Sequence, residues 1–384
     1  LSTSRAGAVT FGAGSLTEVG IDAATADKTA VPDQAQPLSS VEVVGRQVEM
    51  QAGSTIRVPG GSVAISALPN PGERPVGDTP LPKDAESRIR LAAGSVIDVS
   101  GSEAEIDLSR SLVEVELRTN ELRDSPVQRD GELRGETVFV DSRVGTPLAD
   151  VSGATGSVPQ DVRERTSAGG TVSLVSRGDV VLAEGATIDV SGGAVNYRGG
   201  VLQTTRVVAA DGQVVDISKA DPDRIYQGVS NPTVDVVYGK WGVVETRATP
   251  GLGLYQPGYL EGRAAGTVQF AAPQLVVNGD LFGGVRPSEF QRTPATWPVG
   301  GRLIVGLPDG SGLDLPDYRS PSINFTNDTV PVVVAPGESL PDTWLRLELP
   351  TRYLTEGGFT RTELFSNGVI TVGTDLDLAA GSSV

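Results

Sequence analysis

Residues 168–193, AGGTVSLVSRGDVVLAEGATIDVSGG, carry the clearest indication of the fold. Three short runs of alternating apolar and polar residues follow one another in this stretch, and each run ends in a turn that contains glycine. Strict alternation over so few residues is typical of half-buried β-strands, and glycine-containing turns separate such strands. We therefore expect three strands and three turns in this stretch.

The same rhythm returns at other places in the chain. Alternating pairs of apolar residues begin at Val41 and again at Val63, a spacing of 22 residues. Looser copies lie at 266–285 and from 359 to the end. A period of about 22 residues with three strands in each repeat is the pattern of a parallel β-helix. We predict an all-β fold, a parallel β-helix with three strands per coil.

One turn motif repeats as a local sequence. Its copies are MQAGSTIRVPGG at 50–61, LAAGSVIDVSGS at 91–102, LAEGATIDVSGG at 182–193 and a truncated LAAGSSV at 378–384. Stacked coils must turn at the same place in every coil. Glycine adopts positive φ without a Cβ penalty, and alanine or serine keeps the corner narrow. A β-sandwich would also alternate, but it has no reason to use one corner sequence again.

The copies also fix a register and set the remaining segments apart. The whole chain, 1–384, is then a single rod segment interrupted by excursions at about 67–87, 109–167 and 198–264. The second excursion contains two alternating stretches and is expected to form a two-stranded arm. Aromatic side chains, scarce in the chain, are concentrated in the third, which contains Tyr226, Tyr238, Trp241, Tyr255 and Tyr259.

The register makes two structural predictions. Val99, Ile188 and Val190 should point inward, so a charge at any of them should disrupt the stacking of the coils. Arg57, Asp98 and Asp189 share the outward middle position of the third strand. Neighbouring strands lie about 4.8 Å apart, so Arg57 and Asp98 should be neighbours on one outer face.

Composition excludes several classes of function. The 384 residues include no Cys and no His, which removes disulfides, thiolate metal sites and nucleophiles that depend on either residue. The formal net charge is −17, which disfavours binding to a phosphate backbone. No stretch has the 18 or so uninterrupted apolar residues of a membrane helix. We therefore expect neither a nucleic-acid partner nor insertion into a membrane.

The chain resembles the filamentous haemagglutinin-like exoproteins of bacterial two-partner secretion systems over about 40–384. The resemblance is carried by the repeated corner motif and by three further segments: ELRDSPVQRDGELRGETVFVDSRVGTPLADVSGA at 121–154, PGYLEGRAAGTVQFAAPQLVVNGDL at 257–281 and GFTRTELFSNGVITV at 358–372. It implies a right-handed β-helix that is exported through an outer-membrane β-barrel transporter and is secreted or held at the cell surface. The NPNL and NPNGI motifs of the family's secretion domain are not evident, so we expect an internal fragment of a longer protein.

The resemblance implies a structural or adhesive role in cell adhesion or attachment to a biofilm matrix, without enzymatic activity. The host-cell, glycan or matrix ligand stays open, and the sequence assigns no catalytic, cofactor-binding or metal-binding residue. The alternative is a carbohydrate-active β-helix enzyme, a polysaccharide lyase or hydrolase. Its candidate carboxylates are Asp98 and Asp189 on the third sheet, Glu114 and Glu116 on the arm, and Asp221 and Asp223 in the third excursion.

Each of these features also has a plain structural explanation. Isolated outward acids keep a stacked sheet in contact with water, and the glycine pairs at 283–284 and 300–301 fit turns better than phosphate loops. The aromatic residues of 198–264 could stack on sugar rings or on a protein partner. A long excursion that needs a small core of its own would use them equally well.

Overall fold

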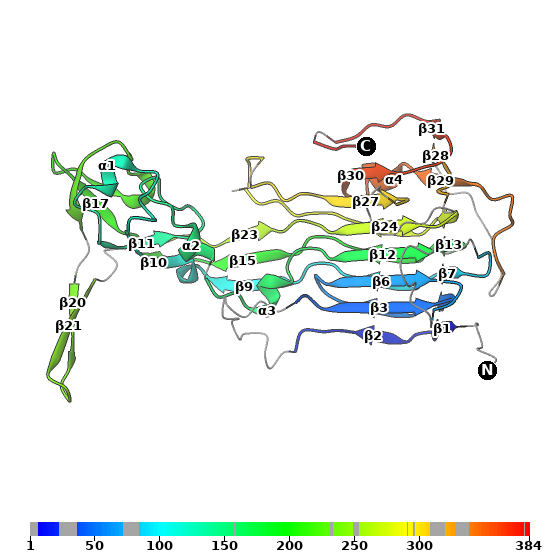
Figure 1. The fold of residues 1–384 in the computed structure, drawn as a ribbon, viewed down its shortest axis with the longest axis horizontal. Helices are drawn as coiled ribbons and strands as arrows, with labels where there is room; N and C mark the ends of the chain where they lie inside the picture. Colours follow the sequence, from blue (N-terminus) through cyan, green and yellow to red (C-terminus); the bar gives the residue numbers. More distant parts are fainter. Residues whose placement is uncertain are drawn as a thin grey trace.

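A computed structural model gives the fold of most of the chain. Strands dominate, and the helices are few and short. Figure 1 shows a stack of parallel strands at one end of the long axis and a smaller head at the other. The structure describes residues 7–22, 37–71, 84–156, 158–230, 233–248, 253–289, 291–294, 296–307, 319–327, 338–379 and 381–384.

Three parallel sheets make up the stack, and successive strands of the chain pass from one sheet to the next. The first sheet has the order β3 (Ser40–Gly45), β6 (Ser62–Ala67), β12 (Thr171–Ser176), β24 (Thr267–Ala271), β27 (Gly301–Val305), β30 (Phe359–Leu364). The second has the order β1 (Ala8–Phe11), β4 (Gln47–Met50), β7 (Arg88–Leu91), β13 (Asp179–Leu182), β25 (Gln274–Val277). The third has the order β2 (Leu16–Glu18), β5 (Thr55–Arg57), β8 (Val96–Asp98), β14 (Thr187–Asp189), β26 (Asp280–Phe282).

The register of these sheets follows the sequence repeats. In the first sheet, Val63 pairs with Val41 on one side and with Val172 on the other. In the third sheet, Ile97 lies between Ile56 and Ile188. The predicted register is confirmed at these positions.

The predicted pair on the outer face of the third sheet is confirmed as well. Arg57 and Asp98 are cross-strand partners, and Arg57 Nε lies 3.2 Å from Asp98 Oδ2. The Arg57 side chain is nearly half exposed, at 47%. The pair therefore contributes only about 0 to 1 kcal/mol to stability.

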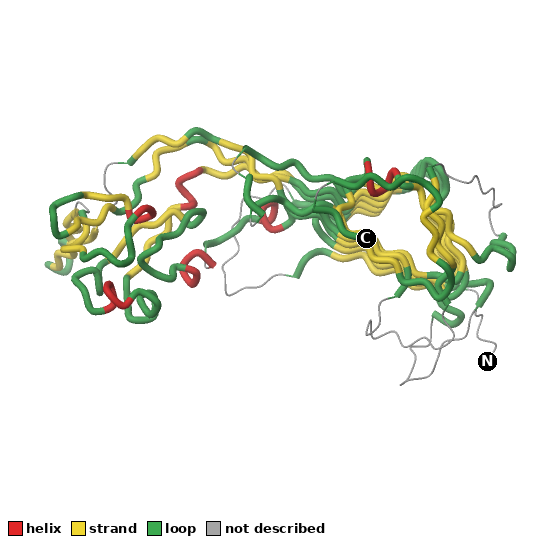
Figure 2. Tube along the Cα trace, turned by 90° about the horizontal axis from the view of Figure 1, so that it is seen from above, coloured by secondary structure: helices red, strands yellow, loops and turns green. Residues whose placement is uncertain are grey.

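The inward side chains of the three sheets form one continuous apolar core. Val99, Ile188 and Val190 are fully buried in it, as predicted. Figure 2, viewed from above, shows the strands lying over one another around this interior. Most core residues are Val, Ile and Leu; the fully buried rings among the described core residues are Phe270, Phe325, Tyr353 and Phe359, all in the C-terminal part of the chain. Small aliphatic side chains thus fill a long, narrow interior.

The repeated corner motif forms the same turn in each copy. Gly53, Gly94 and Gly185 have φ of 73°, 78° and 78°, the left-handed region that favours glycine. Just after the first two, the Ser54 and Ser95 hydroxyls each donate to the carbonyl three residues earlier, at 2.7 Å. The motif therefore repeats because each of these three corners needs one left-handed residue followed by a compact side chain, which is Ser54, Ser95 or Ala186.

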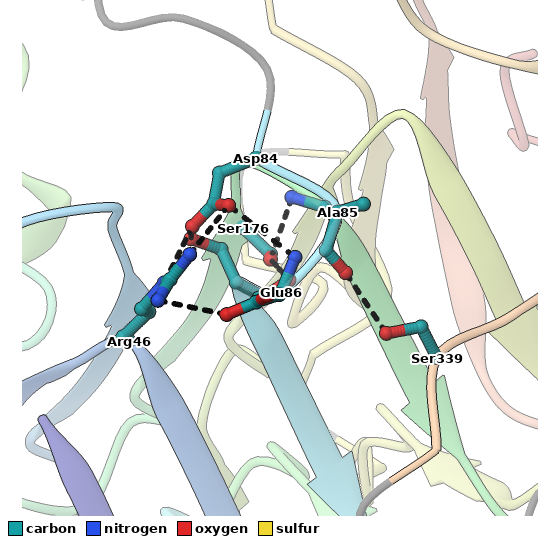
Figure 3. Close-up of polar contacts among 8 residues, drawn as sticks. Arg46, Asp84, Ala85, Glu86, Ser176 and Ser339 are labelled. Atoms are coloured by element: carbon teal, nitrogen blue, oxygen red, sulfur yellow. Dashed lines mark hydrogen bonds and ion pairs between the residues drawn. The ribbon is translucent and has the colours of Figure 1, made fainter. Parts of the chain in front are cut away.

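A polar network ties the corner between the first and second sheets (Figure 3). Arg46 donates from Nε and Nη2 to the Asp84 carboxylate at 2.9 and 3.0 Å, and the Ser87 hydroxyl donates to the same carboxylate at 2.8 Å. The hydrogen bond from Arg46 lowers the pKa of Asp84. The Ser339 hydroxyl, from a segment far along the chain, donates to the Ala85 carbonyl at 2.9 Å.

The C-terminal end of the stack departs from the repeat. β28 (Ser322–Thr326) pairs in parallel with β29 (Arg346–Pro350) on one side and with β31 (Ile370–Val372) on the other. Within the described residues the third sheet ends at β26, and α4 (Arg352–Thr355) contacts that strand. The expected last copy is therefore partial: β30 joins the first sheet, whereas LAAGSSV forms no strand in its described residues and makes one isolated bridge, between Ser383 and Arg361.

The excursions leave the stack at different places. β6 ends at Ala67 and β7 begins at Arg88, and residues 72–83 of that excursion lie outside the described residues. The other two leave through a three-stranded sheet, which we call the neck; the third excursion also returns through this sheet, whereas the second returns through residues 158–167, outside it. In the neck, β15 (Ala194–Arg198) pairs in parallel with β9 (Glu103–Asp107) and antiparallel with β23 (Tyr259–Gly262).

Beyond the neck, residues 108–156 and 199–230 form the head. Its first part contains η1 (Leu108–Ser111), β10 (Leu112–Glu116), α1 (Pro126–Arg129), β11 (Thr137–Asp141) and α2 (Ser152–Gly156), with β10 and β11 paired antiparallel. Its second part contains β16 (Gly200–Leu202), which pairs with β22 (Leu254–Gln256), and β17 (Arg206–Ala209), which lies between β18 (Val214–Asp216) and β19 (Tyr226–Val229), with η2 (Ile217–Lys219) after β18. A hairpin of β20 (Thr233–Tyr238) and β21 (Val243–Ala248) projects from it.

The two parts of the head share one apolar core. Val115, Leu133 and Val138 from the second excursion pack with Val207 and Tyr226 from the third. The Gln128 side chain also crosses between them and donates to the carbonyls of Pro222 and Arg224 at 2.9 and 2.8 Å. The aromatic-rich excursion thus builds its core together with the arm, at a distance from the stack (Figure 1).

Candidate binding cleft at the neck

The carboxylates singled out from the sequence are spread over different parts of the molecule. Asp98 and Asp189 are cross-strand partners on the third sheet. Glu114 and Glu116 lie on the exposed side of β10, and Asp221 and Asp223 lie in the loop before β19. In the described part of the chain, no three acidic side chains are grouped so that they could hold a metal ion.

Asp98 and Asp189 have local structural partners. Asp98 Oδ1 accepts hydrogen bonds from the Ser100 backbone N–H at 3.1 Å and from the Ser100 hydroxyl at 2.7 Å. Asp189 Oδ1 accepts one from the Ser191 backbone N–H at 2.8 Å. An aspartate that accepts from the backbone two residues later is a common turn former. The Asp-Val-Ser sequence thus closes the corner after the third strand, a role that the motif itself could have revealed.

The aromatic residues of the third excursion lie in four different places. Tyr226 is buried in the head, where its hydroxyl donates to the Asp221 carbonyl at 3.1 Å. Tyr238 and Trp241 lie at the tip of the hairpin, and Tyr255 is exposed on β22. Tyr259 alone lies at the neck. These residues therefore form no single aromatic surface.

The neck holds a cleft of about 950 Å³. The neck sheet has a small core of Ala104, Ile106 and Val195, against which Tyr197 packs. Six separate segments of the chain line the cleft: 106–111, 141–144, 158–164, Tyr197, 256–264 and 291–298. The size is within the range of small-molecule sites.

Arg143 is the most constrained charged group in this cleft. It donates to both oxygens of the buried Asp141 carboxylate, at 2.9 Å from Nε and 2.5 Å from Nη2, and from Nη1 to the Tyr259 hydroxyl at 2.9 Å. Burial disfavours its charge, but the hydrogen bonds to Asp141 and Tyr259 prevail and raise its pKa. The guanidinium is therefore permanently charged and held in one orientation.

Two tyrosine rings stack beside this arginine. Tyr197 of β15 and Tyr259 of β23 have ring centroids 4.8 Å apart and planes inclined by 17°. The Arg143 guanidinium carbon lies 5.7 and 5.4 Å from the two centroids, within range of a cation–π contact. Burial raises the pKa of both hydroxyls. Both tyrosines are therefore neutral at physiological pH and can donate a hydrogen bond.

Two further ion pairs complete the polar lining. Arg110 donates from Nη2 to Glu164 at 2.7 Å, and Arg263 Nη1 lies 2.9 Å from Glu261. Glu164 is held by α3 (Val162–Arg165), where its side chain and that of Asp161 each accept a hydrogen bond from the other residue's backbone N–H. This capping box fixes the carboxylate at the rim of the cleft.

The sequence did not single out this site, apart from Tyr259. Its charged and aromatic groups come from the separate segments around the cleft, and none belongs to a repeated motif. One local signal exists: Asp161 followed three residues later by Glu164 is the pattern of a capping box. That pattern predicts a helix start but carries no information about a cleft.

Comparison with known proteins adds no relative. No protein-family model, curated protein or solved structure matches this chain. Among the described residues, no helix combines the length and the apolar content needed to cross a membrane. The case for a function therefore depends on the repeats and on the geometry described above.

Proposed function

We propose that the three parallel sheets form a right-handed parallel β-helix, and that the chain is a structural and adhesive rod segment of a large secreted bacterial surface exoprotein. The observation that carries the proposal is the in-register pairing of three strand sets around one continuous apolar core. Such a stack lengthens by adding coils without changing its cross-section. Its outside is then available to support protruding elements.

The head supports an adhesive role more than a purely structural one. A rod that served only as a spacer would gain nothing from an excursion with its own core and a concave site at its base. The stack alone would be sufficient for a spacer. A head that projects from the side of a rod can contact another cell or a biofilm matrix, and so mediate adhesion or attachment.

Export would follow the route of the exoproteins that the sequence resembles, through an outer-membrane β-barrel transporter. The absence of cysteine is compatible with passage of an unfolded chain through a narrow pore. The protein would then be secreted or held at the cell surface. Its transporter would be a partner during export only.

The adhesive role is tested with beads coated with the purified chain. Chain-coated and albumin-coated beads are incubated with cultured epithelial cells and with a Gram-negative biofilm, and the beads retained after washing are counted. We expect several-fold greater retention of chain-coated beads on at least one surface, and competition by the soluble chain. Equal retention of the two kinds of beads would contradict the proposal.

An assay of polysaccharide cleavage distinguishes the enzymatic alternative from the structural and adhesive role. A lyase or hydrolase that uses Asp98 or Asp189 would release unsaturated or reducing ends from acidic or neutral polysaccharides, and the release would disappear in Asp98→Asn or Asp189→Asn. The contacts of these carboxylates with Arg57, Ser100 and Ser191 give a reason to expect no release.

A further inference from the structure

The charges that line the neck cleft are balanced. They are three arginines, Arg110, Arg143 and Arg263, and three carboxylates, Asp141, Glu164 and Glu261. Each arginine has one of these carboxylates as its partner. The cleft therefore lacks the excess positive charge that would attract an anion, and the net charge of −17 on the chain repels anionic polymers. A charged ligand would have to separate an existing ion pair.

The cleft keeps hydrogen-bonding capacity for an uncharged ligand. The Tyr197 hydroxyl has no hydrogen-bond partner among the residues that the structure describes, although burial and the nearby charge of Glu261 keep it protonated. Glu261 is paired with Arg263 through one of its oxygens, and its side chain is 24% exposed. A donor and an acceptor that are both fixed by their surroundings suit a ligand rich in hydroxyl groups.

The tyrosine stack supplies an apolar surface next to these polar groups. Because Tyr197 and Tyr259 are stacked on each other and Tyr259 is bonded to Arg143, the rings are ordered before any ligand arrives. The face of an aromatic ring is negative and attracts the C–H groups of a flat apolar surface. Sugar rings combine such C–H faces with hydroxyls at their edges.

We propose that the neck cleft binds an uncharged oligosaccharide, with the Tyr197 hydroxyl and the Glu261 carboxylate as hydrogen-bonding groups and the tyrosine stack as the apolar platform. This inference names the ligand class for the adhesive role and in that sense rests on the proposed function. The charge balance separates it from recognition of uronates or sulfated glycans. Arg143 and Asp141 act as positioning residues, because Arg143, bonded to Asp141, holds the Tyr197–Tyr259 ring pair in place and joins the head to the neck.

The test is isothermal titration calorimetry of the purified chain with neutral hexasaccharides of glucose, mannose and N-acetylglucosamine, and with a hexagalacturonate. We expect at least one neutral hexasaccharide to bind and the hexagalacturonate to bind at least tenfold more weakly. Tyr197→Phe keeps the ring stack and removes one hydroxyl, so it should weaken binding about three- to tenfold. Glu261→Gln should weaken binding by a similar factor.

Matched controls make the outcome specific. Trp241→Ala removes an exposed aromatic side chain outside the cleft, so binding should not change. Unchanged thermal unfolding of Tyr197→Phe shows that its effect is not a folding defect. The inference is overturned if no neutral hexasaccharide binds, if the hexagalacturonate binds more tightly, or if Tyr197→Phe and Glu261→Gln both bind as the unmodified chain does.

The same sugars separate this inference from the proposed function. If chain-coated beads adhere but a bound neutral hexasaccharide at saturating concentration does not release them, adhesion uses another surface and the inference fails alone. If a hexasaccharide binds in the cleft but the beads adhere to no surface, the adhesive role fails alone. Release of the beads by that hexasaccharide supports both.

Discussion

The stack and the head solve the same problem, burial of apolar side chains, in two ways. In the stack, the partners of a residue lie on the neighbouring strands of the same sheet, so that Val63 meets Val41 and Val172 at the same position of their strands. In the head, contacts such as that of Gln128 with Pro222 and Arg224 join unrelated segments and occur once. Regular pairing therefore leaves a period in the sequence, whereas a core of single contacts leaves none.

The largest expected effect is a buried charge in the stack. Val190→Asp places a carboxylate at a fully buried position with no partner, and we expect it to lower the free energy of unfolding by at least about 4 kcal/mol or to prevent folding. Urea denaturation followed by far-ultraviolet circular dichroism measures the change. Val138→Asp is the matched variant in the head and should leave the β signal of the stack largely intact.

An unchanged urea midpoint for Val190→Asp would refute the inward assignment of this strand. Complete loss of the β signal in Val138→Asp would refute the separation of the two cores. The pair therefore tests the comparison from both sides.

The second prediction concerns cooperativity between the regions. Leu133→Ala removes a fully buried side chain of the head, and Leu174→Ala removes one of the stack. Each should cost about 2 to 5 kcal/mol. Since the side chains belong to different cores, differential scanning calorimetry should show two transitions, each lowered by only one of the variants. If both variants lower one common transition, stack and head unfold as a unit.

The register of the stack could be predicted from the sequence for a physical reason. The same corner sequence recurs along the chain, and Gly53, Gly94 and Gly185 mark equivalent points in it, so the intervening strands align. That alignment alone predicts that Arg57 and Asp98 are neighbours. The C-terminal end does not follow it, because β29 inserts beside β28 out of chain order.

The candidate site was not open to prediction in this way. Tyr197, Arg143, Glu164 and Glu261 lie in segments that alternation and turn signals describe as strands or loops, and only the fold of the neck brings them together. Charge balance within a cleft depends on contacts between distant segments. Composition reports only the sum over the whole chain.

The third prediction compares a turn in each region. Gly94 in a corner of the stack and Gly135 in the head have φ of 78° and 88°, and a Cβ at either would meet no atom closer than 3.5 Å. Gly94→Ala and Gly135→Ala should therefore each cost about 1 to 2 kcal/mol through backbone strain alone. Calorimetry should assign the first loss to the stack and the second to the head. A cost for Gly94→Ala well above that for Gly135→Ala would mean that the stacked corners amplify a local distortion.

The smallest effect is a difference in pH dependence between two aspartates. Burial raises the pKa of Asp179 in the stack, against a hydrogen bond from the Leu340 backbone N–H at 3.0 Å. Burial acts in the same direction on Asp216 in the head, but hydrogen bonds from Ser218 and Thr204 outweigh it and lower the pKa. The two groups should therefore change stability in opposite directions as the pH rises.

The sign follows from linkage between ionisation and folding. Asp216, with a lowered pKa in the folded state, stabilises the head above the ordinary aspartate pKa of about 3.9 and loses this effect as the pH falls through its folded pKa. Asp179, with a raised pKa, stabilises the stack at low pH and loses this effect as the pH rises through its folded pKa.

Relative to the unmodified chain, Asp216→Asn should destabilise the head at pH 7 and much less near pH 2. Asp179→Asn, whose amide oxygen can still accept from Leu340, should gain stability in the stack between pH 3 and pH 7. Differential scanning calorimetry of both variants across this pH range measures the two unfolding temperatures. If both variants shifted these temperatures in the same direction relative to the unmodified chain, the opposite pKa shifts of Asp179 and Asp216 would be contradicted.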